Sequence, residues 1–507
     1  MDPSSSPTET ISAAEEKFEA LRRKAGFFLA PLGFLLTLWW ASSVLPPPAA
    51  RLSAVLVLMV LFWLTESIPL PVTALLGAVL NIVLGVADAK TVLAPFADPI
   101  IFIFIGGFML SRAMTRHKLD RRIALAVLSL PGVSGSPFRI LGAMGLVAAL
   151  VSMWVSNTAT TAIFLPIALG VLGSLTGGES PRGQAYATGM MLMLAYAASI
   201  GGIVTPVGSP PNLIALGQLE KLANIEIGFL TWILVMVPIF AMMFGVLWVM
   251  LWFFHPADRN LKVRSENLAA FLSQQRAILG KWTPGQVSTA IAFAVAIILW
   301  LLPGVAQAVL GAKHEYVVFL NRYFPESIVA LLASCLLFFL PGENGARALD
   351  WESASKIDWG IILLFGGGIS LGALMFSTGV AKAMGEAAAG LFGPEAGLWA
   401  LTGLAIAVGI VLSETTSNTS SATMLCPVLI ALADGMGVSP IAPTLGACLG
   451  ASMGFMLPVS TPPNAIVYGS GLVPLPSMLR AGIVFDVLGF LVIWGGLRVI
   501  CPLLGLV

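Results

Sequence analysis

The sequence predicts an all-α polytopic membrane protein with about 11 transmembrane helices and two re-entrant hairpins, built as two inverted repeats. Two observations carry this prediction. The 507 residues are 58% hydrophobic and only 10% charged, against roughly 25% charged in soluble proteins, so the chain has too few charges to cover the surfaces of soluble domains. The polar triplet Ser-Asn-Thr also occurs twice, each time within a long apolar stretch. The composition predicts the membrane, and the duplication predicts the repeats.

The scarcity of reactive side chains excludes several classes of protein. A formal net charge of +1 excludes a general polyanion binder, so we expect no nucleic-acid partner. The four cysteines stand in apolar runs without CxxC spacing, and the three histidines are far apart, which predicts no disulfide framework, no zinc site and no histidine proton relay. The chain also lacks a Ser/His pair, a paired aspartate and an HExxH motif. We therefore expect that the protein is not an enzyme.

Apolar stretches follow one another along nearly the whole chain. Residues 1–26 are polar and show no cleavable signal peptide, so we expect a cytoplasmic N-terminal segment ahead of a retained first span at 27–45. Basic residues crowd three segments, 17–24, 112–122 and 259–281, and the positive-inside rule places all three in the cytoplasm. We expect an integral protein of the plasma membrane, or of the inner membrane in a bacterium. The further apolar stretches lie near 52–66, 70–86, 140–173, 186–204, 228–254, 286–310, 326–340, 359–378, 397–434, 440–457 and 481–505.

The second half of the chain resembles the first. Ser156-Asn157-Thr158 recurs as Ser417-Asn418-Thr419, and Gly208-Ser209-Pro210-Pro211-Asn212 matches Ser460-Thr461-Pro462-Pro463-Asn464. We divide the chain into a first half, 27–255, a cytoplasmic linker, 256–284, and a second half, 285–507. Each half is expected to hold a glycine-rich re-entrant hairpin (98–112, 358–376), a span broken at Ser-Asn-Thr (156–158, 417–419) and a second hairpin that turns at Pro-Pro-Asn (210–212, 462–464). Paired repeats with interrupted apolar segments are typical of secondary transporters.

The repeated triplet carries chemistry that suits a small cation and an anion together. Ser, Asn and Thr favour caps and turns, so three in a row should unwind an apolar span. The unwound turn frees carbonyl oxygens beside hydroxyl and amide oxygens, which suits Na+, and it points the N-terminus of the next half-helix into the cavity, which suits an anion. Ser152 and Ser413 each lie four residues before a triplet and add a second hydroxyl on the same helical face.

A plainer interpretation is that these polar side chains only hydrogen-bond between packed helices. Packing alone does not require the same triplet in both halves, so the duplication favours a binding site. Glu414 is a carboxylate in an apolar span and is a functional candidate by its position. Its partner in the repeat is Met153, which cannot ionise. The sequence therefore does not support a symmetric pair of coupling carboxylates.

The two triplets, the Pro-Pro-Asn motifs and the run LPVSTPPNAIVYGSG from Leu457 to Gly471 resemble the divalent anion/sodium symporter family of dicarboxylate, citrate and sulfate carriers. The resemblance covers nearly the whole chain, 27–505. It implies a homodimer in which each protomer has a scaffold domain and a transport domain that moves as an elevator. It implies a first Na+ site at Ser152, Ser156, Asn157 and the carbonyl of Gly208, and a second at Ser413, Ser417, Asn418 and the carbonyl of Ser460. It also implies that the substrate faces Asn157, Thr158, Ser209 and Pro210 in the first half, and Asn418, Thr419, Thr461 and Pro462 in the second.

On these grounds we expect a Na+-coupled carrier of C4-dicarboxylates such as succinate, malate or fumarate, with sodium ions and the lipid bilayer as its other partners. A Na+-independent dicarboxylate exchanger and a Na+-coupled citrate or sulfate carrier stay open as alternatives. An ion channel is disfavoured, because two halves within one chain suit alternating access better than a filter repeated around a pore. The sequence does not settle the Na+ stoichiometry. It also leaves the substrate length open, because one or two pocket side chains decide between a dicarboxylate and a tricarboxylate or sulfate.

Overall fold

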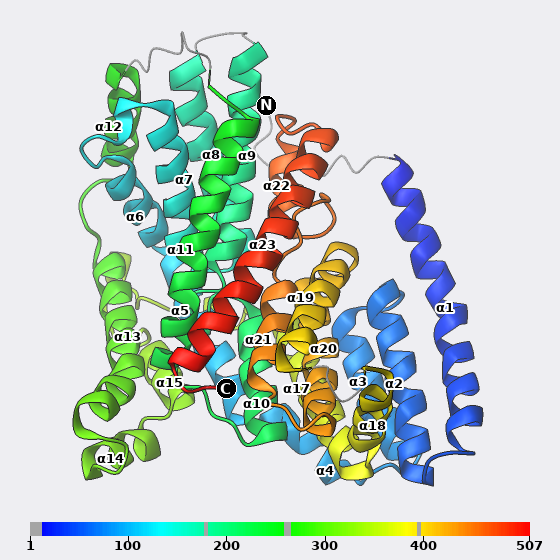
Figure 1. Ribbon diagram of the computed structural model, residues 1–507. Helices are drawn as coiled ribbons and strands as arrows, with labels where there is room; N and C mark the ends of the chain where they lie inside the picture. Colours follow the sequence, from blue (N-terminus) through cyan, green and yellow to red (C-terminus); the bar gives the residue numbers. More distant parts are fainter. Residues whose placement is uncertain (1–12, 177–180, 258–264, 393–396) are drawn as a thin grey trace.

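The computed structural model describes residues 13–176, 181–257, 265–392 and 397–507, and it is almost entirely helical over them (Figure 1). Within these residues the only β pairing is an isolated bridge between Pro341 and Arg347. Nine of the described helices are long and apolar enough to cross a membrane, or ten if one bent pair counts as a single span. The chain is therefore a polytopic membrane protein, whereas the expected count of about 11 spans is not confirmed.

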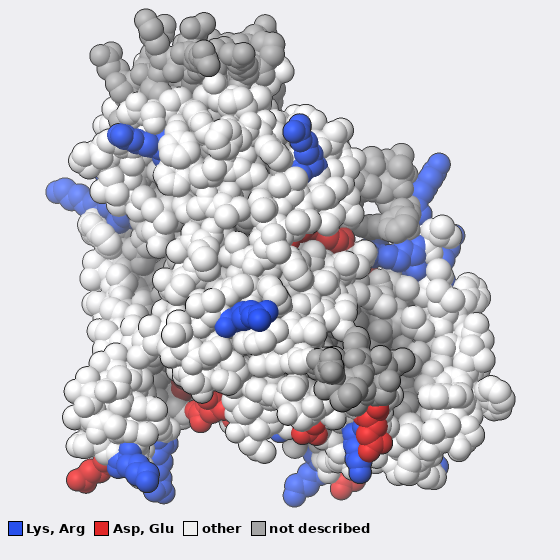
Figure 2. Space-filling model, in the orientation of Figure 1, with Lys and Arg blue, Asp and Glu red and all other residues white. Residues whose placement is uncertain are grey.

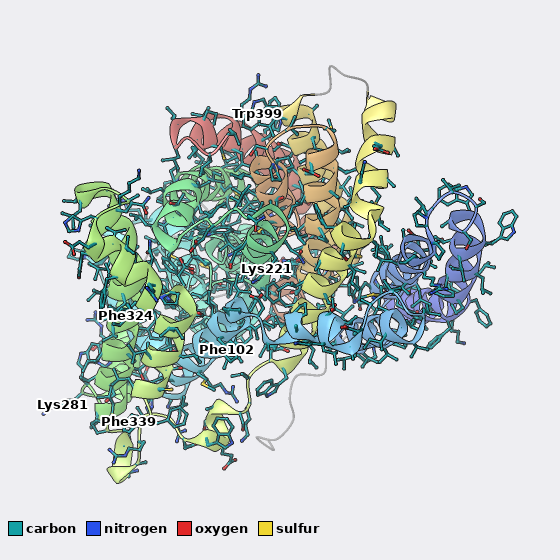
Figure 3. The ribbon with its side chains drawn as sticks, turned by 90° about the horizontal axis from the view of Figure 1, so that it is seen from below. Phe102, Lys221, Lys281, Phe324, Phe339 and Trp399 are labelled. Atoms are coloured by element: carbon teal, nitrogen blue, oxygen red, sulfur yellow. The ribbon has the colours of Figure 1, made fainter. Side chains whose placement is uncertain are left out.

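Three N-terminal helices form one edge of the molecule: α1 (Ala13–Ala41), α2 (Pro47–Thr65) and α3 (Leu70–Val83). α1 packs along α2, and α3 packs on α17 (Trp359–Thr378). Seen from below, these helices stand to one side, and the segment around Phe324 and Phe339 lies at the opposite edge (Figure 3). Phe28 and Trp39 of α1 are 78% and 79% exposed. A helix that presents such large apolar side chains outward is suited to contact with lipid.

The two glycine-rich segments that were predicted as re-entrant hairpins are continuous helices. Residues 98–112 lie almost wholly in α5 (Pro99–Arg116), and 358–376 lie almost wholly in α17. Their glycines permit close helix packing instead of a turn. A Cβ on Gly106 would lie 2.5 Å from the backbone of Ala330 in α15 (Glu326–Leu336), and one on Gly367 would lie 2.6 Å from the Cβ of Ala74 in α3. Small residues at such contacts are a common device of membrane helices.

The first Ser-Asn-Thr triplet lies at the tip of a helical hairpin. α7 (Pro137–Ser152) runs alongside α9 (Pro181–Gly201) in the same direction. Near their first turns, the hydroxyl of Tyr186 donates to the carbonyl of Pro137. Near their last turns, a Cβ on Gly201 would lie 2.5 Å from the backbone of Ala149. α8 (Asn157–Thr176) ends next to the start of α9 in sequence and packs on both helices. α8 therefore runs back along α7 (Figure 1). The apolar stretch near 140–173, predicted as a span broken at the triplet, is this hairpin of two helices.

The second triplet has the same setting. α19 (Leu398–Thr415) runs alongside α21 (Ile441–Gly450), with Gly409 against Ala451 and Gly446 against Thr402. α20 (Asn418–Gly435) lies between them in sequence, runs in the opposite direction and packs on both. The predicted span over 397–434 is thus also two antiparallel helices. A run of apolar residues does not reveal this reversal, because both arms of a buried hairpin are apolar.

The Pro-Pro-Asn segments begin new helices, and no hairpin turns there. After α9 the chain breaks at 202–209 and continues as α10 (Pro210–Ala223), which packs on α17, α20 and α21 and does not lie back along α9. After α21 it breaks at 451–461 and continues as α22 (Pro462–Gly469), which packs on α8 and α9. Proline at the first helical positions suits a helix start, since its missing N–H would have no intrahelical partner there. α10 of the first half therefore packs on the hairpin helix α20 of the second half, and α22 of the second half packs on the hairpin helix α8 of the first.

The remaining helices surround these elements. α14 and α15 form the pair bent by 61°. α12 lies in the predicted linker 256–284, of which 258–264 is outside the described residues. Most of the visible surface is free of charge, and Lys, Arg, Asp and Glu gather mainly toward its two ends (Figure 2). The bounds are α4 (Ala89–Leu93), η1 (Ala94–Ala97), α6 (Leu119–Leu128), η2 (Val133–Gly135), α11 (Phe229–Phe254), α12 (Ser265–Leu279), α13 (Pro284–Leu310), α14 (Glu315–Tyr323), η3 (Glu343–Gly345), α16 (Trp351–Ala354), α18 (Val380–Phe392) and α23 (Leu475–Leu503).

Candidate functional site

The first hairpin tip gathers four of the predicted site residues. Ser156 accepts a hydrogen bond from the N–H of Ala159 at 3.3 Å and so caps the start of α8. Ser152, at the end of α7, donates a hydrogen bond of 2.7 Å to the side-chain oxygen of Asn157. Ser152 is fully buried, whereas Ser156 and Thr158 are exposed at the tip. The tip therefore places hydroxyl and amide oxygens together at the N-terminus of a 20-residue helix.

The second tip repeats this geometry. Ser417 accepts from the N–H of Ser420 at 3.2 Å and caps α20. Ser413 donates a hydrogen bond of 2.8 Å to the side-chain oxygen of Asn418, and it also bonds the carbonyl of Ala451 at 2.9 Å. Thr419 is half-buried beside it. Both predicted Ser and Asn pairs are thus in contact, with the same spacing in sequence.

Two buried asparagines hold the loops that follow α9 and α21. The side-chain amide of Asn212 donates to the carbonyls of Gly202 and Thr205, each at 2.8 Å. Asn464 donates in the same way to the carbonyls of Gly454 and Leu457, each at 3.0 Å. Asparagines near the start of a helix often cap it, but Asn212 and Asn464 do not use their amides in this way. They stabilise the preceding loops instead, and the two sets of bonds span the same sequence separations, ten and seven residues.

These loops lie directly against the hairpin tips. A Cβ on Gly202 would stand 2.5 Å from the side-chain oxygen of Asn157, and one on Gly208 would stand 2.9 Å from the carbonyl oxygen of Met153. In the second half, a Cβ on Gly454 would stand 2.9 Å from the hydroxyl of Ser413. Glycine leaves room for this approach. The fold thus brings Ser152, Asn157 and Gly208 together, and likewise Ser413, Asn418 and the loop that carries Ser460.

Each Pro-Pro-Asn helix packs on helices of the other half: α10 packs on α20 and α21, and α22 packs on α8 and α9. Ser209 and Thr461 precede these helices and are 4% exposed, and Thr461 also accepts from the N–H of Asn464 at 3.4 Å. Pro210 is half-buried and Pro462 is exposed. Because α10 packs on α20 and α22 packs on α8, the helices that carry the predicted substrate-facing residues of one half are in contact with those of the other half.

Glu414 has a role that the sequence did not predict. Its carboxylate accepts hydrogen bonds from the N–H of Phe455 at 2.5 Å, the N–H of Met456 at 2.8 Å and the hydroxyl of Ser460 at 2.5 Å. In the first half, the loop is held at the equivalent place by the hydroxyl of Thr205, which donates to the backbone oxygen of Met153. The one signal in the sequence was the presence of a carboxylate in an apolar span.

The donor set fits a sodium ion. The groups at both tips are hydroxyl, amide and backbone oxygens, the ligands that hard cations prefer. Within the described residues no group of three or more His, Cys, Asp or Glu side chains is placed to hold a metal ion. Arg22 reaches the carbonyl of Thr415 at 2.6 Å, just before the second triplet, and it pairs with Glu66 at 3.2 Å. Its charge is therefore compensated at the place where it comes near the tip.

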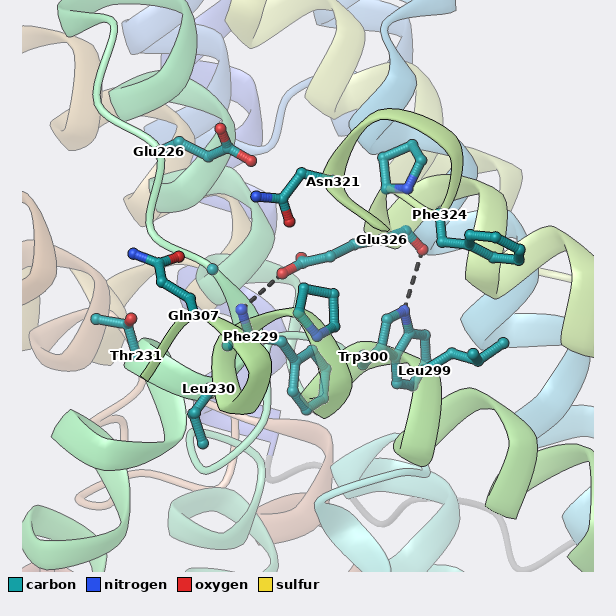
Figure 4. A pocket seen from close by; sticks show the side chains of 14 residues that line it. Glu226, Phe229, Leu230, Thr231, Leu299, Trp300, Gln307, Asn321, Phe324 and Glu326 are labelled. Carbon is teal, nitrogen blue, oxygen red and sulfur yellow. Dashed lines mark hydrogen bonds between the residues drawn. The ribbon is translucent and has the colours of Figure 1, made fainter. Parts of the chain in front are cut away.

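A separate pocket lies between α11, α13 and the α14–α15 bend. Its volume is about 230 Å³, and its lining includes Glu226, Gln307, Asn321 and Glu326 (Figure 4). Glu326 accepts from the N–H of Phe229 at 2.6 Å, and its backbone oxygen accepts from the indole of Trp300 at 3.0 Å. None of the predicted site residues lines this pocket. It is distinct from the tips and loops described above.

A family profile described as "Sodium:sulfate symporter transmembrane region" matches residues 27–505. The chain belongs to this sodium:sulfate symporter family. An uncharacterized transporter of Haemophilus influenzae is 34% identical over 464 residues, which are 89% of this chain and 92% of that protein. The sodium-dependent dicarboxylate transporter SdcS of Staphylococcus aureus is 32% identical over 477 residues, 92% of this chain and 89% of that protein. These relatives are transporters and not enzymes.

Two solved structures share the fold of this family member. Neisseria gonorrhoeae MtrF, whose structure illuminates a class of antimetabolite efflux pumps, matches with a TM-score of 0.54 at 16% identity, over 91% of this chain and 97% of that chain. The YdaH transporter of Alcanivorax borkumensis matches with a TM-score of 0.54 at 14% identity and covers 91% of this chain and 99% of its own. At such low identity the likeness concerns the fold alone.

Proposed function

We propose that the protein is a secondary active transporter that carries C4-dicarboxylates, such as succinate, malate or fumarate, by symport with Na+. The observation that carries this proposal is the duplicated tip-and-loop geometry. Each half presents a Ser–Asn pair bonded across a hairpin tip, packed against a loop that a buried asparagine holds by two carbonyls. The similarity to the dicarboxylate transporter of Staphylococcus aureus supports the substrate class.

We assign the first Na+ site to Ser152, Ser156, Asn157 and the carbonyl of Gly208, and the second to Ser413, Ser417, Asn418 and the carbonyl of Ser460. The dicarboxylate is assigned to Asn157, Thr158, Ser209 and Pro210 together with Asn418, Thr419, Thr461 and Pro462. Hydroxyls, amides and helix N-termini bind carboxylates without a Lys or Arg. Bound Na+ then supplies the positive charge. Sodium binds first, because its charge and the ordering of the loops create the anion site.

The proposed architecture comprises two inverted repeats, 27–255 and 285–507, joined by the linker 256–284. Matching helix contacts support this division: α7 and α8 pack on α9 as α19 and α20 pack on α21, and α10 and α22 each cross to the other half. From the family resemblance we propose a homodimer and elevator movement of the hairpins and broken helices against a scaffold. The basic segments support a cytoplasmic N-terminus and a plasma-membrane location.

Uptake of labelled succinate into proteoliposomes tests this function. We expect accumulation driven by an inward Na+ gradient and no accumulation with K+ or a proton gradient alone. Uptake that is indifferent to Na+ but requires internal dicarboxylate would establish the exchanger instead. Competition by citrate or sulfate at lower concentration than succinate would establish a citrate or sulfate carrier. Single-channel currents far above carrier rates would identify a channel.

A further inference from the structure

The first helix, α1, is bonded to the turn that joins α2 to α3. Ser67, in this turn, donates a hydrogen bond of 2.8 Å to the carbonyl of Arg23. The hydroxyls of Ser67 and Thr65 lie 2.8 Å apart, and a Cβ on Gly26 of α1 would stand 2.0 Å from each of them. A helix held this closely cannot slide along its neighbour. The turn therefore fixes the position of Arg22, which lies one helical turn before Gly26.

Arg22 bridges this turn and the second hairpin tip. Its Nη2 lies 3.2 Å from a carboxylate oxygen of Glu66, and its Nη1 donates a hydrogen bond of 2.6 Å to the carbonyl of Thr415. The planar guanidinium makes both contacts at once because its nitrogens point in different directions. The side chains of Arg22 and Glu66 are only 19% and 28% exposed. Water therefore screens this ion pair less than it screens a pair on an open surface.

The carbonyl that Arg22 holds belongs to the last residue of α19. The last carbonyls of a helix have no N–H partner within it, and a cation there also interacts favourably with the helix dipole. The carbonyl of Glu414 accepts from the hydroxyl of Ser460 at 3.2 Å, and the carbonyl of Thr415 accepts from Arg22. Ser417, which caps α20, follows directly after this turn of backbone. Arg22 thus bonds the chain just before the residues assigned to the second Na+ site.

The first hairpin tip has a different contact at the same place. The residue that stands before the first triplet as Thr415 stands before the second is Trp154. Its ring packs edge-on against Phe293 of α13, with 6.2 Å between the ring centroids. An apolar contact in the first half therefore corresponds to a charged contact in the second. The two tips are alike within themselves, but their contacts with the surrounding helices are not equivalent.

We propose that Arg22 is a positioning residue for the second Na+ site: held by Glu66, it anchors the end of α19 and so fixes the turn that carries Ser417 and Asn418. Arg22 does not touch the ion and acts through the backbone of Thr415. Without the guanidinium this carbonyl loses its donor, the turn gains freedom, and ordering the turn again when Na+ binds costs affinity. The inference rests on the proposed function only in calling this turn a sodium site.

Hydrogen–deuterium exchange of the purified full-length protein tests the anchor directly. In Arg22→Ala, peptides over 412–421 should exchange roughly tenfold faster than in the wild type, because the end of α19 has lost a hydrogen bond from a charged donor. Peptides over 151–160, at the first tip, should not change. Lys24→Ala removes the same charge from a nearby exposed position on α1 and is the matched control. Unchanged exchange at 412–421 in Arg22→Ala would overturn the proposal, whether or not the protein transports succinate.

Stabilisation by NaCl in a thermal-shift assay tests the positioning role. Arg22→Ala should lower the apparent Na+ affinity by roughly fivefold, and Arg22→Lys, which keeps the charge and a donor, should recover most of this loss. Glu66→Gln should show part of the loss. The double variant Arg22→Ala/Glu66→Gln should bind Na+ no more weakly than Arg22→Ala, because Glu66 acts through Arg22. Wild-type affinity in Arg22→Ala would refute the role, and so would additive losses in the double variant.

Uptake of succinate by the wild type separates this inference from the proposed function. Faster exchange and weaker stabilisation by NaCl in Arg22→Ala, without any Na+-driven uptake by the wild type, would refute the proposed function alone. Na+-driven uptake by the wild type, with exchange and Na+ affinity unchanged in Arg22→Ala, would refute the inference alone.

Discussion

The hydroxyl of Ser413 donates a 2.8 Å hydrogen bond to the side-chain oxygen of Asn418, and Ser152 and Asn157 form the same bond at 2.7 Å in the other half. Each bond joins the last turn of one hairpin arm to the first residue of the other. The two oxygens are therefore already adjacent before any cation arrives. Such preorganisation lowers the cost of ordering the ligands when an ion binds.

Replacing the asparagine of either pair tests the sodium sites. Asn157→Ala and Asn418→Ala each remove an amide oxygen that is bonded to a serine of the hairpin tip, so each should lower the apparent affinity for Na+ and for succinate by roughly tenfold or more. Uptake measured against Na+ and succinate concentration reports both changes. Asn321→Ala, in the separate pocket, should leave both affinities unchanged. Normal transport by either tip variant would show that its assignment is wrong.

The loop asparagines should matter for stability as well as binding. Asn464→Ala leaves the carbonyls of Gly454 and Leu457 without their donor, and Asn212→Ala does the same to Gly202 and Thr205. An unsatisfied buried group costs about 1–3 kcal/mol. We expect a lower Tm in detergent for both variants, and a smaller stabilisation by NaCl because the loop is no longer held. A variant with unchanged Tm would contradict the role of that side chain.

Two glycine variants test the close contact between α5 and α15, which lies where a re-entrant hairpin was predicted. Gly106→Ala places a Cβ 2.5 Å from the backbone of Ala330, so α5 and α15 must separate, at a cost of about 1–3 kcal/mol. Gly245 lies on α11, and no atom lies within 4 Å of the position that a Cβ would take there, so Gly245→Ala is the matched control. We expect thermal unfolding to begin at lower temperature only in Gly106→Ala. Equal Tm values would exclude a tight contact.

One histidine should make stability depend on pH. Burial, with a smaller contribution from Arg480, lowers the pKa of His255 from 6.5 to about 4. As pH falls from about 6.5 to 4, the unfolded chain takes up a proton that the folded protein does not, so the free energy of unfolding should decrease over this window, on the order of 1–3 kcal/mol. His255→Gln should remove that part of the decrease. Unfolding temperatures at pH 7.5 and pH 5 measure it, and an unchanged difference would contradict the assignment.

The candidate site was more predictable than the path of the chain around it. The residue types of one Ser–Asn pair, Ser152 and Asn157, recur at the same spacing as Ser413 and Asn418. This recurrence can be read from the sequence without knowing how the surrounding helices fold. The roles of Asn212 and Asn464 could not be read from the sequence, because a side chain next to a helix start can bond forward to the helix or back to the loop. Geometry alone selects between these options.

The sequence by itself determined that this protein lies in a membrane, that the same polar motifs recur in its two halves and that each motif supplies hydroxyl and amide oxygens. Composition and repetition are sufficient for those conclusions. Only the tertiary structure decided that the triplets lie at hairpin tips, that the glycine-rich segments are continuous helices and that the carboxylate of Glu414 holds the loop at 455–460. Whether an apolar helix continues or turns back after a break depends on which faces pack together, and residues far apart in the chain supply those faces.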